Sequence, residues 1–238
     1  QYPVCLPEYA DTKDAINMYS FIDQLSLQSA EGDVFVADAG SAYYAISQGV
    51  QLFKPNQRYI PSGAMATMGF SLPAAIGISI ALGRKRVLAI TGDGSLQQNI
   101  QELQTVVQYN LPIKLFVLNN DGYLSIRNSQ KTYFDQRFIG ESEESGVSLP
   151  DTLKIADAYG INSYRVNNLN ALEKVIAKAL NFQGPVICDI ITPREQLIIP
   201  TVSSRVNEDG SMSSRPLEDM FPFLDREEYR KNLFIKEV

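Results

Sequence analysis

The order of apolar and polar positions along the chain predicts helices that alternate with short buried strands. Between Thr12 and Ala30 apolar side chains recur at the spacing of one helical face, and the run DVFVAD that follows has the length of a buried strand. The same reasoning predicts further strands at residues 58–63, 86–94, 113–120, 163–168 and 184–192. It predicts further helices at residues 72–83, 97–110, 148–160 and 172–180.

Two of these helices carry start signals in the sequence. Ser148 is a candidate N-cap ahead of Pro150, which suits a first helical turn, and Gly160 marks the end of that helix. Asn170 is followed three residues later by Glu173, which is the pattern of a capping box. We therefore expect these helices to begin at Ser148 and Asn170.

The predicted strands are nearly continuous apolar runs, which is typical of strands that are buried on both faces. Such strands belong to parallel sheets with helices on both sides. We therefore predict a three-layer α/β fold whose sheet is mainly parallel and has about six strands. Beyond Pro193 the periodicity fades, so we expect one domain over residues 1–195 and a C-terminal tail over residues 196–238.

Composition excludes several classes of function. The formal net charge of -6 argues against a nucleic-acid partner, and no apolar run is long enough to cross a membrane. The chain contains no histidine, so its chemistry must depend on carboxylates, hydroxyls, backbone groups or a cofactor. Cys5 and Cys188 cannot form a disulfide framework, which fits a reducing cytoplasm. The start lacks both Met and a secretory signal, so we expect a fragment of a longer chain.

Small and polar residues follow three of the predicted strands. They form the clusters Asp38–Ser41, Gly92–Ser95 and Asn119–Gly122. In open parallel sheets, ligands bind in the crevice at the carboxyl ends of the strands, so we expect the three clusters to meet there. Gly92 and Gly94 allow the backbone to approach a ligand closely, and a helix that begins after Ser95 presents free N–H groups to an anion. This pattern predicts a phosphate site.

Asp93 would repel a phosphate bound in this place unless a cation lies between them. The Asp93 carboxylate, the Asn120 amide oxygen and a backbone carbonyl form a set of oxygen ligands that suits Mg²⁺. A bound diphosphate would supply the remaining ligands. Neither G-x-G-x-x-G nor a glycine loop ending in G-K-[ST] occurs in this segment, so the usual nucleotide-binding loops do not compete.

Two stretches of sequence resemble a known family. The segment GDGSLQQNIQELQTVVQYNLPIKLFVLNN, residues 92–120, resembles the thiamine diphosphate motif, which starts with GDG and ends with NN. The segment SGAMATMGFSLPAAIG, residues 62–77, resembles the part of acetolactate synthases that lies just upstream of this motif. Weaker similarity runs from about Asp11 to beyond Pro193. The chain is thus similar to the C-terminal, diphosphate-binding domain of acetolactate synthase-like enzymes.

The resemblance implies a cofactor site. Mg²⁺ would be held by Asp93, Asn120 and the carbonyl of Gly122. Met68 would lie under the cofactor and force its V shape, and the Ala66 carbonyl would accept from the 4′-amino group. The simpler interpretation of Met68 is a core methionine. The implied cofactor-binding residues are Gly40, Ser41, Ala42, Ala66, Met68, Gly92, Asp93, Gly94, Ser95, Asn120, Gly122 and Tyr123.

The resemblance also implies an activity, namely decarboxylation of a 2-oxo acid such as pyruvate and transfer of the product to a carbonyl acceptor. The family is homo-oligomeric, as dimers or tetramers, and a glutamate from a separate pyrimidine-binding domain protonates the cofactor ring. No catalytic residue is therefore expected in this fragment, which should be inactive alone, and Glu102 is interpreted as a structural or interface residue. FAD, which some relatives bind in a middle domain, is left open.

Three departures from the synthase pattern limit the substrate assignment. Ser125 and Ser129 stand where the synthases carry a Met and a Trp that shape the acceptor pocket. Residues 40–42 replace a Gln-His pair, and NNDGY is closer to the decarboxylase motif. Arg127 matches a synthase arginine, although an exposed helix arginine explains it equally well. A simple 2-oxo acid decarboxylase and a non-catalytic cofactor-binding or assembly domain therefore stay open as alternatives.

Overall fold

The chain divides into two compact units, Gln1–Gln196 and Leu197–Val238. The computed structural model describes residues 3–202, 204–206 and 209–235. The first unit contains an α/β sheet with its helices, and the second contains a short hairpin and a helix. Each unit is described by itself below.

The first unit is organised around a six-stranded sheet in which every strand pair is parallel. The strand order is β2-β1-β3-β4-β6-β5. Strand β2 therefore lies on one side of β1, and the later strands β3 to β6 lie on the other. This result confirms the predicted parallel sheet of about six strands. The strands are β1 Val34–Ala37, β2 Arg58–Pro61, β3 Val87–Gly92, β4 Ile113–Asn119, β5 Asn162–Val166 and β6 Val186–Ile191.

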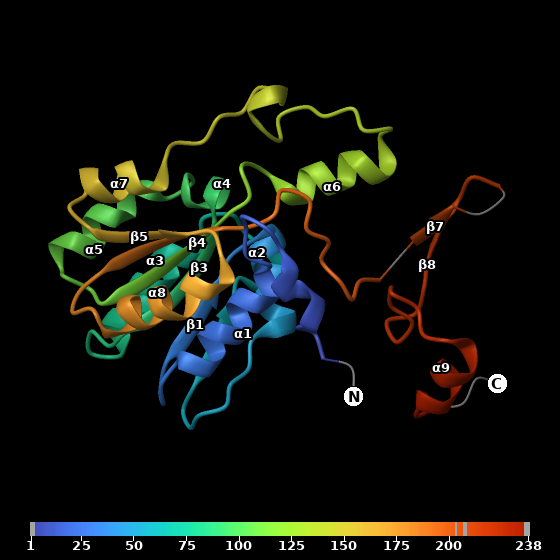
Figure 1. The fold of residues 1–238 in the computed structure, drawn as a ribbon, viewed down its shortest axis with the longest axis horizontal. Helices are drawn as coiled ribbons and strands as arrows, with labels where there is room; N and C mark the ends of the chain where they lie inside the picture. The colour runs from blue at the N-terminus through green and yellow to red at the C-terminus, as the bar shows by residue number, and fades with distance from the viewer. Residues whose placement is uncertain (1–2, 203, 207–208, 236–238) are drawn as a thin grey trace. The chain divides into compact units, whose positions relative to one another are not determined.

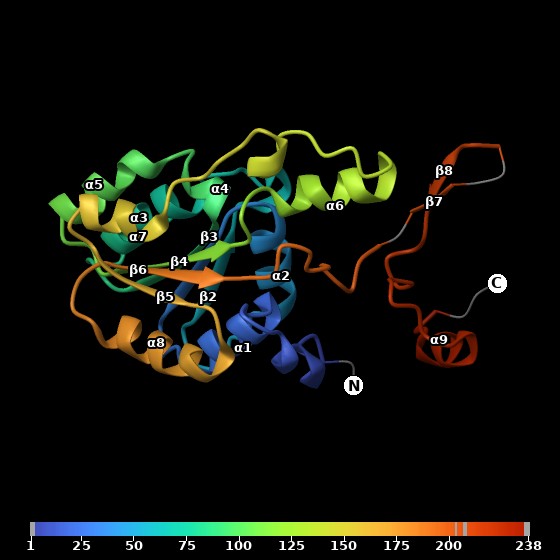
Figure 2. The same cartoon turned by 45° about the horizontal axis from the view of Figure 1, so that its top comes forward.

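Helices cover both faces of the sheet, which makes three layers (Figures 1 and 2). Helices α1 and α8 lie on one face, and α3, α5 and α7 lie on the other. The helices of this unit are α1 Met18–Gln28, α2 Gly40–Gly49, α3 Ser71–Ala81, α4 Asp93–Leu96, α5 Leu103–Gln108, α6 Leu124–Tyr133, α7 Thr152–Ala158 and α8 Leu169–Asn181. Short 3-10 helices η1 to η4 span Pro7–Asp11, Gly63–Met65, Ile100–Glu102 and Glu143–Ser145.

The central strands form the core because their apolar runs have no polar face. Every residue of β1 is buried, and Phe35 in β1, Leu88 in β3 and Phe116 in β4 have no exposed surface. Burying a side chain of this size contributes roughly 1.5–3 kcal/mol to folding. Helices cover both faces of the sheet, so a strand in its centre needs apolar side chains on both sides. The continuous apolar runs of these strands meet this requirement.

Two helices begin at residues other than those predicted. Helix α7 starts after Asp151, whose carboxylate accepts from the N–H groups of Leu153 (2.9 Å) and Lys154 (3.0 Å), so Ser148 is not the N-cap. The reason lies in Pro150, which disfavours a helical conformation in the residue before it. Helix α8 starts after Asn168, which accepts from the N–H group of Ala171 at 3.0 Å, so the prediction of Asn170 was also wrong.

The helix predicted over residues 97–110 is broken, and helices α2 and α6 were not predicted. Residues 97–99 separate α4 from η3 because the Asn99 side chain donates to the Gly69 carbonyl at 2.9 Å. This contact with another segment outweighs the local helical pattern. Helices α2 and α6 begin close behind β1 and β4, so their first turns lie at the carboxyl ends of these strands.

The beginning and the end of the first unit are hydrogen-bonded to each other. The N–H group of Ile16 donates to the carbonyl of Ile191 at 2.8 Å, and that of Met18 donates to the side chain of Gln196 at 2.9 Å. Gln196 also donates to the side chain of Asn17 at 3.3 Å. The segment ahead of α1 is therefore joined to the segment behind β6.

The second unit contains the antiparallel strands β7 Ser204–Val206 and β8 Met212–Ser214, followed by α9 Arg226–Asn232. Two arginines, Arg215 and Arg226, form ion pairs with Asp219. Within the part of the chain that the structure describes, in either unit, no helix is long and apolar enough to span a membrane.

Candidate functional site

The strand register brings three strand ends together at one edge of the sheet. Ala37 at the end of β1 is level with Ile90 in β3, and Ile90 is level with Phe116 in β4. Strands β1 and β3 are neighbours although β2 lies between them in the sequence, so the strand order reverses here. Such a switch point is where open α/β sheets bind ligands.

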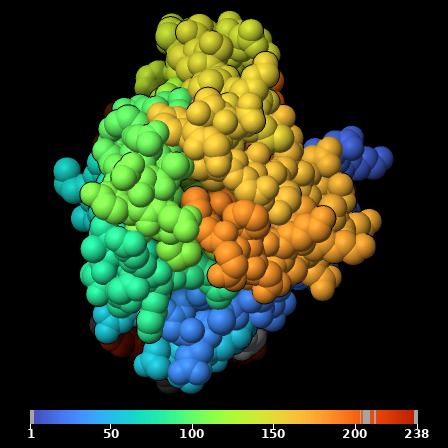
Figure 3. Space-filling model, turned by 90° about the vertical axis from the view of Figure 1, so that its left-hand side faces the viewer, coloured from blue at the N-terminus to red at the C-terminus, as the bar shows by residue number. Residues whose placement is uncertain are grey.

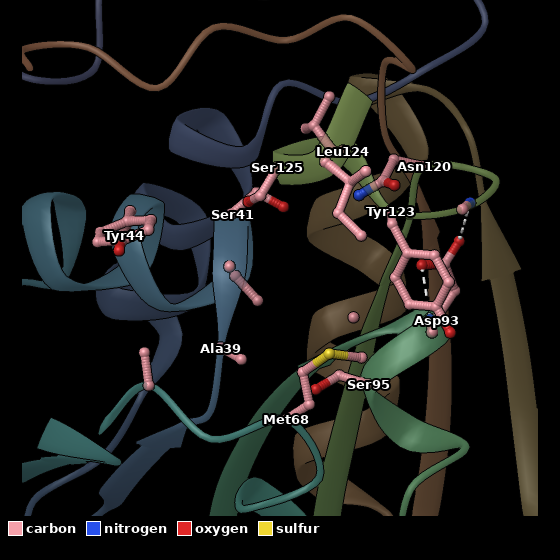
Figure 4. Close-up of a pocket in the computed structure, with 17 residues that line it drawn as sticks. Ala39, Ser41, Tyr44, Met68, Asp93, Ser95, Asn120, Tyr123, Leu124 and Ser125 are labelled. Carbon is pink, nitrogen blue, oxygen red and sulfur yellow. Dashed lines mark hydrogen bonds between the residues drawn. The ribbon is translucent and has the colours of Figure 1, made fainter. Parts of the chain in front are cut away.

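A pocket of about 310 Å³ lies at this switch point (Figure 4). In the close-up, Tyr44, Ser41 and Ser125 lie on one side of it, and Asn120 and Asp93 lie on the other. Its lining includes every residue that the sequence predicted for cofactor binding. These residues are Gly40, Ser41, Ala42, Ala66, Met68, Gly92, Asp93, Gly94, Ser95, Asn120, Gly122 and Tyr123.

Asp93 is a buried carboxylate held by backbone N–H groups. It accepts from Gly94 at 2.8 Å and from Gly122 at 3.0 Å (Figure 4). Burial raises the pKa of the Asp93 carboxyl to about 6, although these N–H groups act in the opposite direction. A cation next to the carboxylate would offset the cost of burial by stabilising the charged form.

Asn120 supplies an oxygen atom that no protein group satisfies. The side-chain carbonyl oxygen of Asn120 is buried and has no hydrogen-bond partner. Leaving such a group unsatisfied costs about 1–3 kcal/mol, so its position calls for a ligand. In the described residues no three His, Cys, Asp or Glu side chains cluster as a metal site. A metal here would therefore depend on one carboxylate, one amide oxygen and backbone carbonyls, which are the ligands that Mg²⁺ prefers.

Asp38, at the end of β1, fixes the floor of the pocket. Its carboxylate has no exposed surface and accepts from the hydroxyls of Thr91 (2.7 Å) and Ser95 (3.0 Å). The Ser95 hydroxyl in turn accepts from the N–H group of Gly69 at 3.0 Å. Burial raises the pKa of Asp38. This chain of bonds ties the ends of β1 and β3 to the segment that carries Met68.

Two glycines let the walls of the pocket approach each other. A Cβ atom on Gly94 would lie 2.3 Å from the ring of Tyr123, so the ring can pack on α4 only because residue 94 is glycine. Gly40 has a φ of +56°, and a Cβ there would lie 3.1 Å from the Ser125 hydroxyl. A side chain at residue 40 would therefore meet both backbone strain and a close neighbour.

The comparison with known protein families identifies the family of the chain. Residues 38–190 match the family described as thiamine pyrophosphate enzyme, C-terminal TPP binding domain. The chain belongs to this family. The match begins at Asp38 and ends at Ile190, so it includes all three strand ends that form the pocket.

Several similar proteins are acetolactate synthases. The chain is 32% identical over 203 residues to the acetolactate synthase large subunit of Cyanidium caldarium, a match that covers 85% of this chain and 33% of the relative. It is 31% identical over 212 residues to the acetolactate synthase isozyme 2 large subunit of Escherichia coli K12, covering 89% and 37% respectively. The chain thus spans about a third of the length of these relatives.

Within this thiamine pyrophosphate enzyme domain, Met68 is a pocket residue. Its side chain lines the pocket and is 37% exposed, so the alternative of a core methionine is excluded. The predicted contact with the cofactor stays a prediction. Ala66, two residues earlier, has a left-handed φ of +44°. A non-glycine residue in this conformation is strained and requires support from its surroundings. Both Ala66 and Met68 line the pocket.

The structure also corrects the interpretation of Arg127. Arg127 lies on α6 with only 5% of its surface exposed, so its interpretation as an exposed helix arginine was wrong. Glu102 does not line the pocket, and its carboxylate accepts from the hydroxyl of Thr105 at 3.0 Å within the same helical segment. Ser129, unlike Ser125, does not line the pocket either.

Several lining residues were missed by sequence reasoning. Tyr44 lies one helical turn after Gly40 on α2, and Leu124 and Ile126 belong to the first turn of α6. All three would follow from extending the strand-end clusters by one turn of helix, since residues four apart share a helical face. Neither helix was predicted, so this signal was not used.

Proposed function

We propose that this chain forms the diphosphate- and Mg²⁺-binding half of the active site of a thiamine diphosphate-dependent carboligase that resembles acetolactate synthase. The proposed reaction is the decarboxylation of a 2-oxo acid, with pyruvate as the donor, and transfer of the product to a carbonyl acceptor. The acetolactate synthases among the relatives support this reaction. A reducing cytoplasm fits the buried free thiol of Cys188.

The residues of the pocket have distinct roles in this proposal. Asp93, Asn120 and the Gly122 carbonyl hold Mg²⁺, which neutralises the diphosphate. Ser95 and residues 40–42 bind the diphosphate through backbone N–H groups at the starts of α4 and α2. Met68 supports the folded conformation of the cofactor, and the Ala66 carbonyl accepts from its amino group. When bound, thiamine diphosphate supplies the nucleophile and the electron sink of the reaction.

One observation carries the proposal, namely the unsatisfied side-chain oxygen of Asn120 in the loop that also binds Asp93. A structural turn would not need a buried oxygen without a partner, whereas a metal ligand needs one in this state. The N–H groups of Asn120 and Asp121 also favour the charged form of Asp93. Asp93 on α4 and the loop thus place a carboxylate beside neutral oxygens, a set of ligands that suits a divalent cation.

The remaining parts of the active site belong to other segments in this proposal. A glutamate that acts on the pyrimidine ring comes from a pyrimidine-binding domain, which a second subunit of a homodimer or tetramer supplies. FAD, if the protein binds it, lies in a further domain. The chain alone is then expected to bind thiamine diphosphate weakly and to turn over no pyruvate.

The test is a calorimetric titration of the complete protein with thiamine diphosphate, in the presence and in the absence of Mg²⁺. We expect saturable binding that requires Mg²⁺, and conversion of pyruvate to a carboligation product when a carbonyl acceptor is added. Release of an aldehyde alone would identify a simple decarboxylase instead. Absence of Mg²⁺-dependent binding in the folded, complete protein would contradict the proposal, as would rapid turnover of pyruvate by the 238-residue chain alone.

A further inference from the structure

A buried ion pair lies directly behind the pocket, on residues that do not line it. The Nε atom of Arg127 on α6 donates to a carboxylate oxygen of Glu141. Arg127 is 5% exposed and Glu141 is 4% exposed, so water reaches neither charge freely. Removing two such charges from water is expensive, and the pair by itself is weak evidence for stability. Its position calls for another explanation.

The remaining N–H groups of Arg127 bind the loop that carries the proposed metal ligands. They donate to the carbonyl of Asn120 at 3.2 Å, to that of Asp121 at 2.9 Å and to that of Arg194 at 2.7 Å. A guanidinium can make these bonds at once because its donors form a rigid planar fork. Lysine has a single ammonium group and could not reproduce the geometry. Arg127 thus fixes the direction of two consecutive peptide groups.

Glu141 holds the same loop through its backbone. Its carbonyl accepts from the N–H group of Tyr123 at 2.8 Å. Gly122 lies so close that a Cβ atom there would be 2.0 Å from this carbonyl, and its φ of +130° also favours glycine. The Glu141 carboxylate accepts from the hydroxyl of Ser142 at 2.6 Å. Burial tends to raise the pKa of Glu141, but the bonds from Ser142 and Arg127 outweigh it and lower the pKa.

We infer that Arg127 and Glu141 are positioning residues for metal and diphosphate binding. Together they clamp residues 120–123 from behind, so that the Asn120 side chain and the Gly122 N–H group, which donates to Asp93, keep their places. This inference rests on the proposed function of the pocket. Arg127 and Glu141 do not line the pocket, and they affect binding through the loop that they hold in place.

The test compares variants of the complete protein at two ion pairs. Arg127→Lys keeps the charge but loses the fork, and we expect the apparent Kd for Mg²⁺, measured by calorimetry with thiamine diphosphate present, to rise about tenfold. The matched control is Arg86→Lys, which breaks a forked pair with Asp33 at the opposite edge of the sheet. It should lower the melting temperature to a similar degree and leave the Kd unchanged.

A double variant separates positioning from stability. Arg127→Met with Glu141→Met removes both charges and keeps the volume, so neither partner is left buried and unpaired, and the fold should persist. Its Kd for Mg²⁺ should still be raised, because the bonds to the Asn120 and Asp121 carbonyls are gone. Should Arg127→Lys fail to fold, Glu141→Gln replaces it as the single variant.

The outcomes distinguish this inference from the proposed function. If the wild-type protein shows no Mg²⁺-dependent binding, the proposed function fails. If the wild type binds and the folded Arg127 and Glu141 variants bind Mg²⁺ as tightly, the function stands and the inference is overturned. A loss of affinity in Arg86→Lys equal to that in Arg127→Lys would also overturn it, because the effect would then follow from general destabilisation.

Discussion

The two edges of the sheet both bury charged groups, but they treat them differently. At the edge where the strands begin, Arg86 pairs with Asp33, and Lys114 donates to the carbonyls of Phe182 (2.7 Å) and Gly184 (2.6 Å). Figure 3 shows the molecule from the left-hand side of Figure 1. Protein groups receive these charges directly. Such an arrangement leaves these charges satisfied without a ligand.

At the edge where the strands end, one buried polar atom is held in place without a partner. The Asn120 oxygen is buried without a hydrogen bond, burial raises the pKa of Asp93, and Ala66 and Asp121 have left-handed backbones. Left-handed backbones also occur ahead of strand starts, at Asn56, Arg84 and Asn110, so they do not by themselves separate the two edges. Gln28 and Asn162, which do not line the pocket, also carry a buried side-chain nitrogen without a hydrogen-bond partner. The comparison teaches that neither a buried charge nor an unsatisfied atom identifies a site by itself, whereas an unsatisfied oxygen beside a buried carboxylate in one pocket points to a cation.

The largest effect that would sharpen this contrast is expected for Asp93→Asn. The change keeps the size of the side chain and removes its charge, so affinity for thiamine diphosphate at fixed Mg²⁺ should fall by roughly 2–5 kcal/mol, at least about tenfold. The measurement is a cofactor titration of the complete protein, with circular dichroism to verify folding. Equal affinity in a well-folded variant would show that Asp93 is not a metal ligand.

A smaller loss is expected for Gly94→Ala. The new methyl group would lie 2.3 Å from the Tyr123 ring and displace it from α4, at a cost of about 1–3 kcal/mol in the free energy of unfolding. Cofactor affinity should fall as well, because the ring lines the pocket. The control is Gly77→Ala in α3, where no atom lies within 4 Å of the new Cβ. Denaturant titrations of both variants decide, and equal stability of the two would contradict the packing argument.

At the opposite edge, Asp33→Asn should affect stability alone. The carboxylate accepts from the guanidinium of Arg86 at 2.9 and 2.6 Å and from the N–H group of Ala30 at 2.6 Å. Weakening these bonds should lower the free energy of unfolding by about 1–3 kcal/mol. Cofactor affinity, measured below the melting temperature, should equal that of the wild type. Loss of affinity comparable to that of Asp93→Asn would remove the distinction between the two edges.

The smallest effect concerns the pH dependence of stability at Lys114. Burial lowers the pKa of Lys114 from 10.5 to about 8, so above pH 8 the unfolded state binds more protons than the folded state. Stability from this group therefore rises with pH between about 8 and 10.5, by about 1 kcal/mol from pH 8 to pH 9. From pH 8 to pH 9, the melting temperature of the wild type should rise by roughly 2–4 °C relative to that of Lys114→Met. A constant difference between the two proteins would show that Lys114 is not desolvated.

The sequence predicted those parts of the fold that depend on long apolar runs. The buried strands, their parallel pairing and the meeting of three strand ends follow from residues such as Phe35 and Phe116, because burial on both faces leaves few other arrangements. Helices α2 and α6 were missed. The sequence of α6 is mostly polar, and both helices start without a side-chain cap, at Gly40 and behind Tyr123.

For the site, most of the residues that line the pocket were predicted, whereas the ion pair behind it was not. Asp93 and Asn120 stand at fixed spacing in a motif, so their meeting follows from one strand-helix-strand unit. The partner of Arg127 could not be predicted, because Glu141 lies in a segment without periodic pattern and reaches Arg127 only through tertiary packing. Pairings of this kind depend on the tertiary contacts of loops, which local sequence patterns do not predict.

The hydrogen bonds from Ile16 to Ile191 and from Met18 to Gln196 have a consequence for protein engineering. When the first and last segments of a domain are adjacent, the domain can be circularly permuted with little disturbance of its core. It can also be inserted into a loop of another protein. A short linker from Gln196 back to Ile16 would close the α/β unit into a ring. New termini could then be opened at the exposed turn around Asn56, at the opposite edge from the pocket.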